Sequence, residues 1–528
     1  MDEAVTEATN NQTEPTEPTS SNKRIAKNAL MLYVRMFLTM IVGLYTSRVV
    51  LNTLGVEDYG IYGVVGGVVS MLGFLNASMS GATSRFLTFE LGRGDKKRLK
   101  DTFSSALIVH IGIALVVFVL AETVGLWFLT HKLVIPEGRM TAAHWVYQCS
   151  ILSAMLGITQ APYNATIIAH EKMDIYAYVE ILNVTLKLLI VYLLVIGNFD
   201  KLILYAILVL AVSVFIMMVY RIYCIRHFSE SHFHWIWNPA ILKPLLSFSG
   251  WDLYGNLAFS IRIQGANFII NSFYGVTLNA ACGIAATVQG IMKTFSSNIV
   301  LAFRPQIIKN YSVKDYGPMN EKLRYATKIS MALLVLVTVP IFVKCDYVLK
   351  LWLKIVPDEA VVMTHYTLLM NFASCISSVL LIGIHATGKM KLAGAICGNL
   401  YIFSIPVMYL ILKCGLTYKE CYLMFLIASC LFMFSCAVVL RRQMPEFAIM
   451  EFAKKSMIPL IVMVALSMSC SFLISSFFAD RIIDLIAFVL VSCVITIICS
   501  YMVLLNNEEK KITISYIKMK MSAIRGTK

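Results

Sequence analysis

The feature that most constrains this chain is a series of apolar runs, each about 20 residues long, separated by short polar breaks. A helix needs about 20 apolar residues to cross the roughly 30 Å hydrocarbon core of a bilayer while satisfying its own backbone hydrogen bonds. Hydrophobic residues make up 58% of the chain and charged residues 14%, and the mean hydropathy is +0.74. The sequence therefore predicts an all-α polytopic membrane protein.

The apolar runs predict about fourteen transmembrane helices. Residues 1–22, rich in Thr, Glu, Pro and Asn, are predicted to be a disordered cytoplasmic tail and not a cleaved signal. Helices 1–6 are assigned to an N-lobe (23–225), helices 7–12 to a C-lobe (226–440), and helices 13–14 to 441–505, before a basic tail at 506–528. The predicted spans are 28–51, 58–83, 103–129, 143–166, 175–197, 202–225, 245–272, 276–303, 325–344, 362–385, 393–413, 418–440, 456–478 and 481–505.

The basic residues orient these spans. With the N-terminus inside, about 31 of the 45 Lys and Arg lie on the cytoplasmic side and about 9 on the other. Both termini are therefore predicted to be cytoplasmic. The net charge of +15 is mainly a consequence of this bias, and it gives the protein an affinity for anionic membrane lipid. No nucleic-acid partner is therefore expected. The 13 cysteines are scattered through apolar runs, and neither a disulfide framework, a metal site nor a cofactor is predicted.

An internal repeat relates the two halves of the chain. NTLGVEDYGIYGVV (52–65) recurs as NSFYGVTLNAACGIAA (271–286), which aligns Gly55 with Gly275 and, further on, Arg85 with Arg304. IIAHEKMDIYAY (167–178) matches IHATGKMKLAGA (384–395) in nearly the same register. Six helices separate the copies, so both halves have the same orientation. We expect two six-helix lobes related by a parallel pseudo-two-fold axis, a cavity between them, and two extra C-terminal helices, as in an alternating-access transporter.

Several motifs resemble one family. LGVEDYGIYGVV after the first helix, RFLTFELGRGDKKRLKD after the second, APYNATIIAHEKMDIYAYVEILN across the fourth and fifth, and ATGKMKLA after the tenth look like the polysaccharide exporters. These are the Wzx-type lipid-linked oligosaccharide flippases of the multidrug/oligosaccharidyl-lipid/polysaccharide (MOP) superfamily. The resemblance covers nearly the whole chain from about Lys23 onward.

The resemblance implies a function. Such proteins lie in the bacterial inner membrane and flip an undecaprenyl-pyrophosphate-linked oligosaccharide from the cytoplasmic to the periplasmic leaflet for surface polysaccharide synthesis. Their central cavity is typically cationic and is built largely from the first, second, seventh and eighth helices. Candidate partners are the lipid-linked anionic oligosaccharide, membrane lipid, a coupling ion (proton or sodium) and the polysaccharide polymerase machinery. No catalytic motif carries over, so the site is argued from this chain.

Five of the cations within predicted spans are candidates for deep positions, and each costs on the order of 3 kcal/mol if it lies at the bilayer centre. In the first helix Arg35 shares a face with Thr39 and Thr46, which favours a place in the cavity. Arg48 lies roughly 140° around the helix from Arg35. It either snorkels to the outer interface or reaches the cavity if the helix bends at Gly43. The full set is Arg35, Arg48, Lys187, Arg262 and Lys293.

The seventh helix carries a polar stripe that is expected to face water or polar partners. Arg262 lies off this stripe, so it either lines the cavity or pairs with a neighbouring helix. Lys293 in the eighth helix shares a face with Gln289, which favours the cavity, whereas Lys187 follows Glu180 and is expected to be compensated within its own helix. The stripe consists of Asp252, Asn256, Ser260, Gln264, Asn267 and Asn271.

The predicted substrate-binding residues fall in three of these helices. Arg85 and Arg304 are placed at the cytoplasmic mouth, where they either capture phosphate or control topology. Asp252 is a hypothetical coupling carboxylate. The candidate binding set is Arg35, Thr39, Arg48, Asn256, Ser260, Arg262, Gln264, Asn267 and Lys293.

Three functions compete. A pyrophosphate requires buried cations, and guanidinium binds phosphate oxygens in a bidentate fork, so flipping of an anionic lipid-linked oligosaccharide is favoured. A multidrug-type cation antiporter of the same superfamily would require buried carboxylates, and here the deep charges are mainly basic. A membrane enzyme of polysaccharide assembly would require acid–base residues on a large loop or an acidic metal–nucleotide site, and the sequence offers neither. The protein is therefore not expected to be an enzyme.

Overall fold

The computed structural model describes residues 20–70, 74–131, 135–194, 199–353, 356–357, 359–504 and 510, and every regular element among them is a helix. The fold is the all-α polytopic architecture that the sequence predicts. The tails predicted for 1–22 and 506–528 lie outside the described residues, apart from 20–22 and 510.

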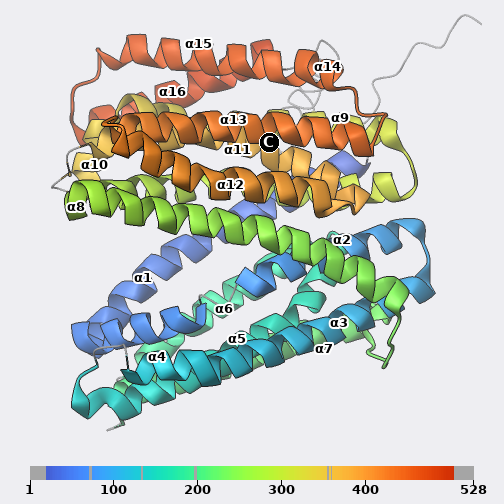
Figure 1. Ribbon diagram of the computed structural model, residues 1–528. Helices are drawn as coiled ribbons and strands as arrows, with labels where there is room; N and C mark the ends of the chain where they lie inside the picture. Colours follow the sequence, from blue (N-terminus) through green and yellow to red (C-terminus); the bar gives the residue numbers. More distant parts are fainter. Residues whose placement is uncertain are drawn as a thin grey trace, which may run out of the picture.

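The helices form two lobes, which appear as the lower and upper halves of Figure 1. In the N-lobe the helices are α1 (Ser20–Ser70), α2 (Phe74–Arg93), α3 (Lys96–Leu120), which continues through a π-helical turn into α4 (Leu126–His131), α5 (Met140–Ala169), α6 (Met173–Leu193) and α7 (Lys201–His227). In the C-lobe they are α8 (Pro239–Ser312), α9 (Tyr316–Val343), α10 (Cys345–Leu353), α11 (Ala360–Thr387), α12 (Met390–Lys413) and α13 (Tyr418–Gln443).

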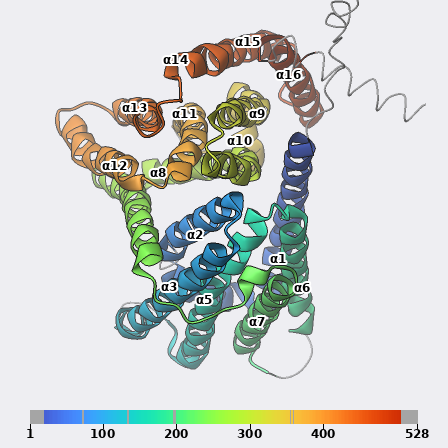
Figure 2. The same cartoon turned by 90° about the vertical axis from the view of Figure 1, so that its right-hand side faces the viewer.

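Three further helices follow the C-lobe and cover its outer side, where α15 and α16 pack against α9 (Figure 2). They are α14 (Ile449–Phe452), α15 (Ile458–Ser475) and α16 (Ile482–Val503). We call the end of the molecule that holds the α2–α3, α7–α8 and α8–α9 connections the basic end; it lies on the right in Figure 1. The opposite end is called the kinked end.

Ten described helices are long and apolar enough to cross a membrane. The remaining passes are made by α5, by the two parts of α8 on either side of Gly275, and by the part of α1 after Gly55 together with α2. The total agrees with the prediction of about fourteen spans. Two details differ from the sequence prediction. The breaks expected near 52–57 and 273–275 are kinks within continuous helices, and the expected loop at 344–360 contains α10.

Both kinks occur at repeat-related glycines. Gly55 in α1 has φ 84° and ψ 168°, and Gly275 in α8 has φ 74° and ψ −164°. Only glycine adopts this region without strain, so the helix can change direction without a loop. The repeat also relates two other pairs of residues with positive φ, Gly94 with Lys314 and Glu171 with Gly388. The backbone therefore repeats the internal symmetry that the sequence indicates.

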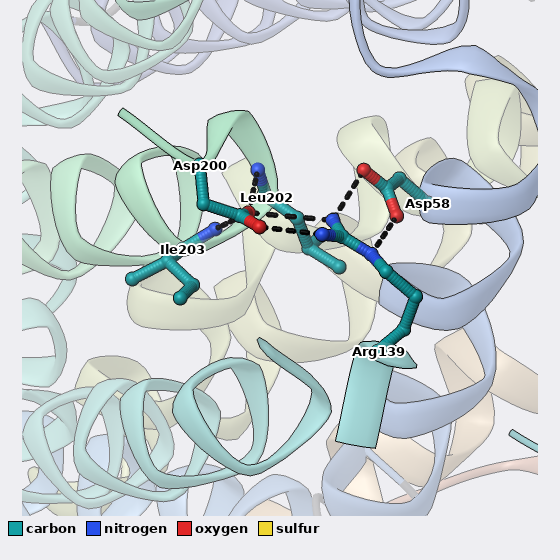
Figure 3. A network of polar contacts seen from close by, with 5 residues as sticks. All are labelled: Asp58, Arg139, Asp200, Leu202 and Ile203. Carbon is teal, nitrogen blue, oxygen red and sulfur yellow. Dashed lines mark hydrogen bonds and ion pairs between the residues drawn. The ribbon is translucent and has the colours of Figure 1, made fainter. Parts of the chain in front are cut away.

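The N-lobe is held together at the kinked end by an ion network (Figure 3). Arg139 Nε donates to Asp58 Oδ1 at 2.8 Å, and its guanidinium also binds Asp200. Asp200 caps α7 by accepting hydrogen bonds from the backbone N–H groups of Leu202 and Ile203. One arginine thus joins the segment after the α1 kink to the starts of α5 and α7.

Candidate functional site

The C-lobe holds a partly open cavity of about 360 Å³ between α8, α11, α12 and α13, with both polar and apolar side chains in its lining. Both arms of α8 contribute to it, because the kink at Gly275 folds the second arm back beside the first. Its polar lining residues are Asp252, Asn256, Arg262, Gln289, Lys293, Asn371, Ser374, Ser377, Ser378, Tyr401 and Ser429. The cavity therefore combines two cations, one carboxylate, and a set of amides and hydroxyls.

Arg262 is surrounded by aromatic rings. Its guanidinium carbon lies 5.2 Å from the ring centroid of Phe259, 5.0 Å from that of Tyr401 and 5.0 Å from that of Phe425. Its Nε is buried without a hydrogen-bond partner. The electron-rich ring faces stabilise the cation and hold the guanidinium in place, but they leave its Nε–H without an acceptor among the described residues.

Lys293 contacts one of the same rings. Its Nζ is 5.3 Å from the centroid of Phe259, so Arg262 and Lys293 both contact this one ring. Among the described residues, neither cation forms an ion pair. Arg262 is partly buried and Lys293 is exposed to the cavity. Two unpaired positive charges in one cavity repel each other and favour an anionic occupant.

Asp252 is the only acidic residue among the described residues that line the cavity. Its carboxylate accepts a hydrogen bond from Asn256 Nδ2 at 3.1 Å, and its Oδ1 lies 3.7 Å from His385 Nε2. The same Asn256 amide lies 3.1 Å from Ser78 Oγ in α2. The acidic end of the cavity therefore adjoins the N-lobe.

Two repeat-related arginines close the gap between the lobes at the basic end. Arg85 in α2 is buried and donates to the carbonyl oxygens of His385 and Ala386, the last turn of α11, at 3.0 and 2.8 Å. Arg304 in α8 donates to the carbonyl oxygen of Gly81 in α2 at 2.9 Å. Each arginine thus reaches from its own lobe into the other.

A second set of contacts joins the lobes close by. Glu171, at the turn after α5, accepts hydrogen bonds from Gln306 Nε2 and Lys309 Nζ of α8, each at 2.7 Å. Glu171 occupies the repeat position of Gly388, which lies against Arg85 in the other lobe. The repeat-related turns at Glu171 and Gly388 therefore both take part in the contacts between the lobes at the basic end.

The predicted residues of α1 are not among those that line this cavity. The guanidinium of Arg35 lies 4.8 Å from the ring centroid of Tyr176 in α6, and Thr39 donates to the carbonyl oxygen of Met36 at 3.1 Å. Arg48 is exposed. The break in helical geometry in α1 falls at Gly55, beyond Arg48, and not at Gly43. Arg35 and Arg48 therefore lie on one uninterrupted helical stretch.

The polar stripe of α8 divides into two parts. Asp252 and Asn256 line the cavity, whereas the other four members, Ser260, Gln264, Asn267 and Asn271, are absent from its lining. Ser260 donates to the carbonyl oxygen of Asn256 at 3.1 Å, and Asn267 donates to Gln264 Oε1 at 3.4 Å. Ser260 and Gln264 have exposed side chains.

Sequence reasoning missed a second polar stripe, in α11. Asn371, Ser374, Ser377 and Ser378 recur at spacings of three and four and line the cavity. The same periodicity that marked α8 could have identified them. His385 was also missed, although it lies within the repeated motif IHATGKM. Tyr401 had no local signal, because its role depends on contact with an arginine far away in the sequence.

Comparisons with known proteins place the fold. No known protein family and no curated protein matches the chain by sequence. Three of the solved structures that resemble it each match 81% of this chain. They are an outward-facing multidrug resistance MATE family transporter of the MOP superfamily (TM-score 0.69, 14% identity, 97% of that chain), a MATE in the bent conformation (0.68, 14%, 96%) and a MOP superfamily transporter from Pyrococcus furiosus (0.63, 15%, 96%). The chain therefore has the fold of MATE transporters of the MOP superfamily.

Proposed function

We propose that this protein is a membrane transporter that flips an anionic, lipid-linked oligosaccharide by alternating access. The carrying observation is the pair of cations in the C-lobe cavity. Arg262 and Lys293 contact one aromatic ring, and neither forms an ion pair among the described residues. Cations without a partner inside a membrane-spanning lobe are costly, and a phosphate group entering the cavity would provide that partner.

The geometry of the lining supports a headgroup that carries both phosphate and sugar. The guanidinium of Arg262 is fixed by three rings, so its N–H donors are oriented before a ligand arrives. Hydroxyls and amides of α11 and Gln289 line the same space and can replace the water that sugar hydroxyls lose. The isoprenoid tail can remain in the bilayer while the headgroup crosses.

The contacts at the basic end support the alternating step. Arg85, Arg304 and Glu171 each bind the opposite lobe in the present conformation. Access to the cavity from this side requires those bonds to break, and the freed arginines would then be available to an incoming phosphate. Arg85 and Arg304 thus serve in turn as closing contacts and as the mouth of the pathway.

In its cellular setting the protein is proposed to lie in the bacterial inner membrane with both termini in the cytoplasm. Its substrate is an undecaprenyl-pyrophosphate-linked oligosaccharide used for surface polysaccharide, and the polysaccharide polymerase machinery is the proposed receiver. A proton or sodium ion is the proposed coupling ion, with Asp252 as the candidate carboxylate because it lies between the cavity and the N-lobe. No enzymatic step is proposed.

A multidrug-type cation antiporter is the second candidate, and one observation favours it. Asp252 is in the cavity, and a carboxylate there can bind a cationic drug or a coupling ion. One of the structural neighbours is described as a multidrug resistance transporter, whereas for another a reversed polarity of the binding pocket is said to suggest a different function. Two cations against one carboxylate give this cavity a positive balance, which supports the anionic substrate.

Deletion of the gene tests the choice. We expect a full-length lipid-linked repeat unit to accumulate on the cytoplasmic side, and a plasmid copy to restore export. Normal surface glycan together with altered sensitivity to cationic drugs would overturn the proposal in favour of the antiporter.

A further inference from the structure

The segment that connects the two lobes, residues 228–238, carries an exposed aromatic strip. Residues 232–238 have no regular secondary structure, and their side chains alternate between outward and inward positions. Trp235 is 77% exposed, Trp237 is 69% exposed and Phe233 is 46% exposed. His234 and Ile236, between them, are partly buried. Three large rings on one side of a short segment are costly to leave in water.

The strip is fixed to the N-lobe by its intervening histidine. His234 Nδ1 lies 2.9 Å from Ser104 Oγ and its Nε2 lies 2.9 Å from Asp101 Oδ1, both in α3. At the start of the segment, Glu230 pairs with His170, whose ring stacks on Phe228 at 4.2 Å between centroids. The exposed rings therefore project from a backbone that is anchored at two places.

The anchoring residues set the depth of the strip relative to the membrane. The first residues of α3 are charged, and a long apolar run begins at Ala106. Ser104 and Asp101 lie between these two parts, about 12 Å or less along the helix from Lys96 at 1.5 Å per residue. The strip thus lies beside the first turns of α3, at the level where polar headgroups meet acyl chains. Figure 2 shows the segment crossing the end of the N-lobe.

Positive charge borders the strip. Lys96, Lys97 and Arg98 are exposed in the first turn of α3. A surface hollow of about 260 Å³ joins this turn to Asn238, the residue that follows Trp237. Arg98 also pairs with Glu90 at 3.2 Å. Its lining residues are Asp95, Lys97, Arg98, Asp101, Asn238, Ala240 and Ile241.

We propose that the Phe233–Trp237 strip and the basic first turn of α3 form one docking surface for the anionic headgroup layer of the membrane. Tryptophan prefers the membrane interface because its ring is apolar and its N–H needs a polar partner. Lysine and arginine beside it attract anionic phospholipid. A membrane surface is favoured over a protein partner because the strip lies at the level of the interface, next to membrane-spanning helices. This inference is independent of the transported substrate.

Tryptophan fluorescence in nanodiscs tests the depth of the strip. The chain has six tryptophans, so the signal of the strip is the difference between the wild type and the Trp235→Phe/Trp237→Phe variant. We expect this signal to be quenched more by lipid brominated near the headgroup than by lipid brominated near the chain end, and to be protected from aqueous acrylamide. Strong quenching by acrylamide with no effect of brominated lipid would overturn the proposal and indicate a surface for a soluble partner.

A second arm tests the preference for anionic lipid. Brominated phosphatidylglycerol is compared with brominated phosphatidylcholine at the same low mole fraction in an unbrominated background. We expect roughly fivefold stronger quenching per molecule by the anionic lipid. Lys97→Gln/Arg98→Gln should abolish this excess and leave quenching by phosphatidylcholine unchanged.

The control variant, Arg442→Gln/Lys454→Gln, removes the same charge from two exposed positions on the same end of the molecule. It should retain the excess. Equal quenching by the two lipids in the wild type, or loss of the excess in both double variants, would contradict a specific basic surface.

Discussion

At the scale of single residues, Arg262 shows how a cation can be placed inside an apolar lobe without a carboxylate. Its partners are the rings of Phe259 in the same helix and of Tyr401 and Phe425 in two other helices. The sequence indicated that Arg262 costs free energy within a membrane span, but it left open whether this residue lines a cavity or pairs with a neighbouring helix. The structure places it in the cavity lining and against neighbouring helices at once.

Substitution of Arg262 tests its role in substrate binding. Arg262→Gln removes the positive charge and the paired N–H donors of the guanidinium. We expect transport activity and headgroup affinity to fall about 10- to 100-fold, as for the loss of a charged hydrogen bond. Arg262→Lys keeps the charge and should retain part of the activity. Arg48→Gln, an exposed arginine outside the cavity lining, is the matched control for insertion and abundance. Equal transport in all three variants would exclude Arg262 from the site.

The Asp58–Arg139–Asp200 network predicts a pH dependence of stability. Burial by itself raises the pKa of Asp200, but the hydrogen bond from Arg139 and the capped backbone N–H groups outweigh it and hold this pKa below its usual range. A carboxyl with a lowered pKa contributes stability above its unfolded pKa of about 3.9 and loses it as pH falls through the folded value. We expect the Tm of the detergent-solubilised protein to drop below about pH 4.

Arg139→Gln should lower Tm at neutral pH by a few degrees, because it leaves two carboxylates without their partner. It should also make Tm depend less strongly on pH in the acid range. An acid profile unchanged by this substitution would show that other carboxylates govern the transition.

At the scale of elements, the kinks replace loops that the sequence predicted. Hydrophobic periodicity finds where an apolar run ends, but it does not distinguish a loop from a glycine at positive φ within a continuous helix. The sequence repeat aligned Gly55 with Gly275, and in the structure both glycines have positive φ and form kinks. The short α10 was missed because a nine-residue helix between spans resembles an ordinary polar connection.

Alanine substitution tests the kink. A Cβ at Gly55 meets no atom within 4 Å, so the cost of Gly55→Ala comes from its φ of 84° alone and should be about 1–3 kcal/mol. Gly60→Ala, in the helical arm of α1 and also without a neighbour within 4 Å, is the matched control. It should be neutral or slightly stabilising. Thermal unfolding of both variants measures the difference, and equal Tm values would show that the kink carries no strain penalty.

At the scale of the whole molecule, the basic end holds the lobes together through Arg85, Arg304 and Glu171. Arg85→Ala removes two bonds to the last turn of α11, and we expect faster hydrogen–deuterium exchange there and in α2. Arg93→Ala, an exposed arginine of the same helix, is the control. Unchanged exchange in the Arg85 variant would show that this arginine does not close the basic end.

The sequence predicted the architecture well because spans and repeats are local or periodic signals. Apolar runs and the two repeated motifs were sufficient for the fold, for about fourteen spans and for the parallel symmetry, whereas the orientation from the positive-inside bias stays a prediction. The site was harder to predict, since its lining comes from four helices that are spread over more than 180 residues, from Trp251 to Phe432. No pattern in a single helix shows that Arg262 and Tyr401 meet.

The most direct test of the account is the charge preference of the C-lobe cavity. Binding to the purified protein should be measured for a short-chain isoprenyl-pyrophosphate sugar and for a lipophilic cationic drug, in the wild type, in Arg262→Gln/Lys293→Gln and in Asp252→Asn. We predict that the anionic ligand binds to the wild type and is lost in the double variant. Binding of only the cation, abolished by Asp252→Asn and unaffected by loss of the two basic residues, would contradict it.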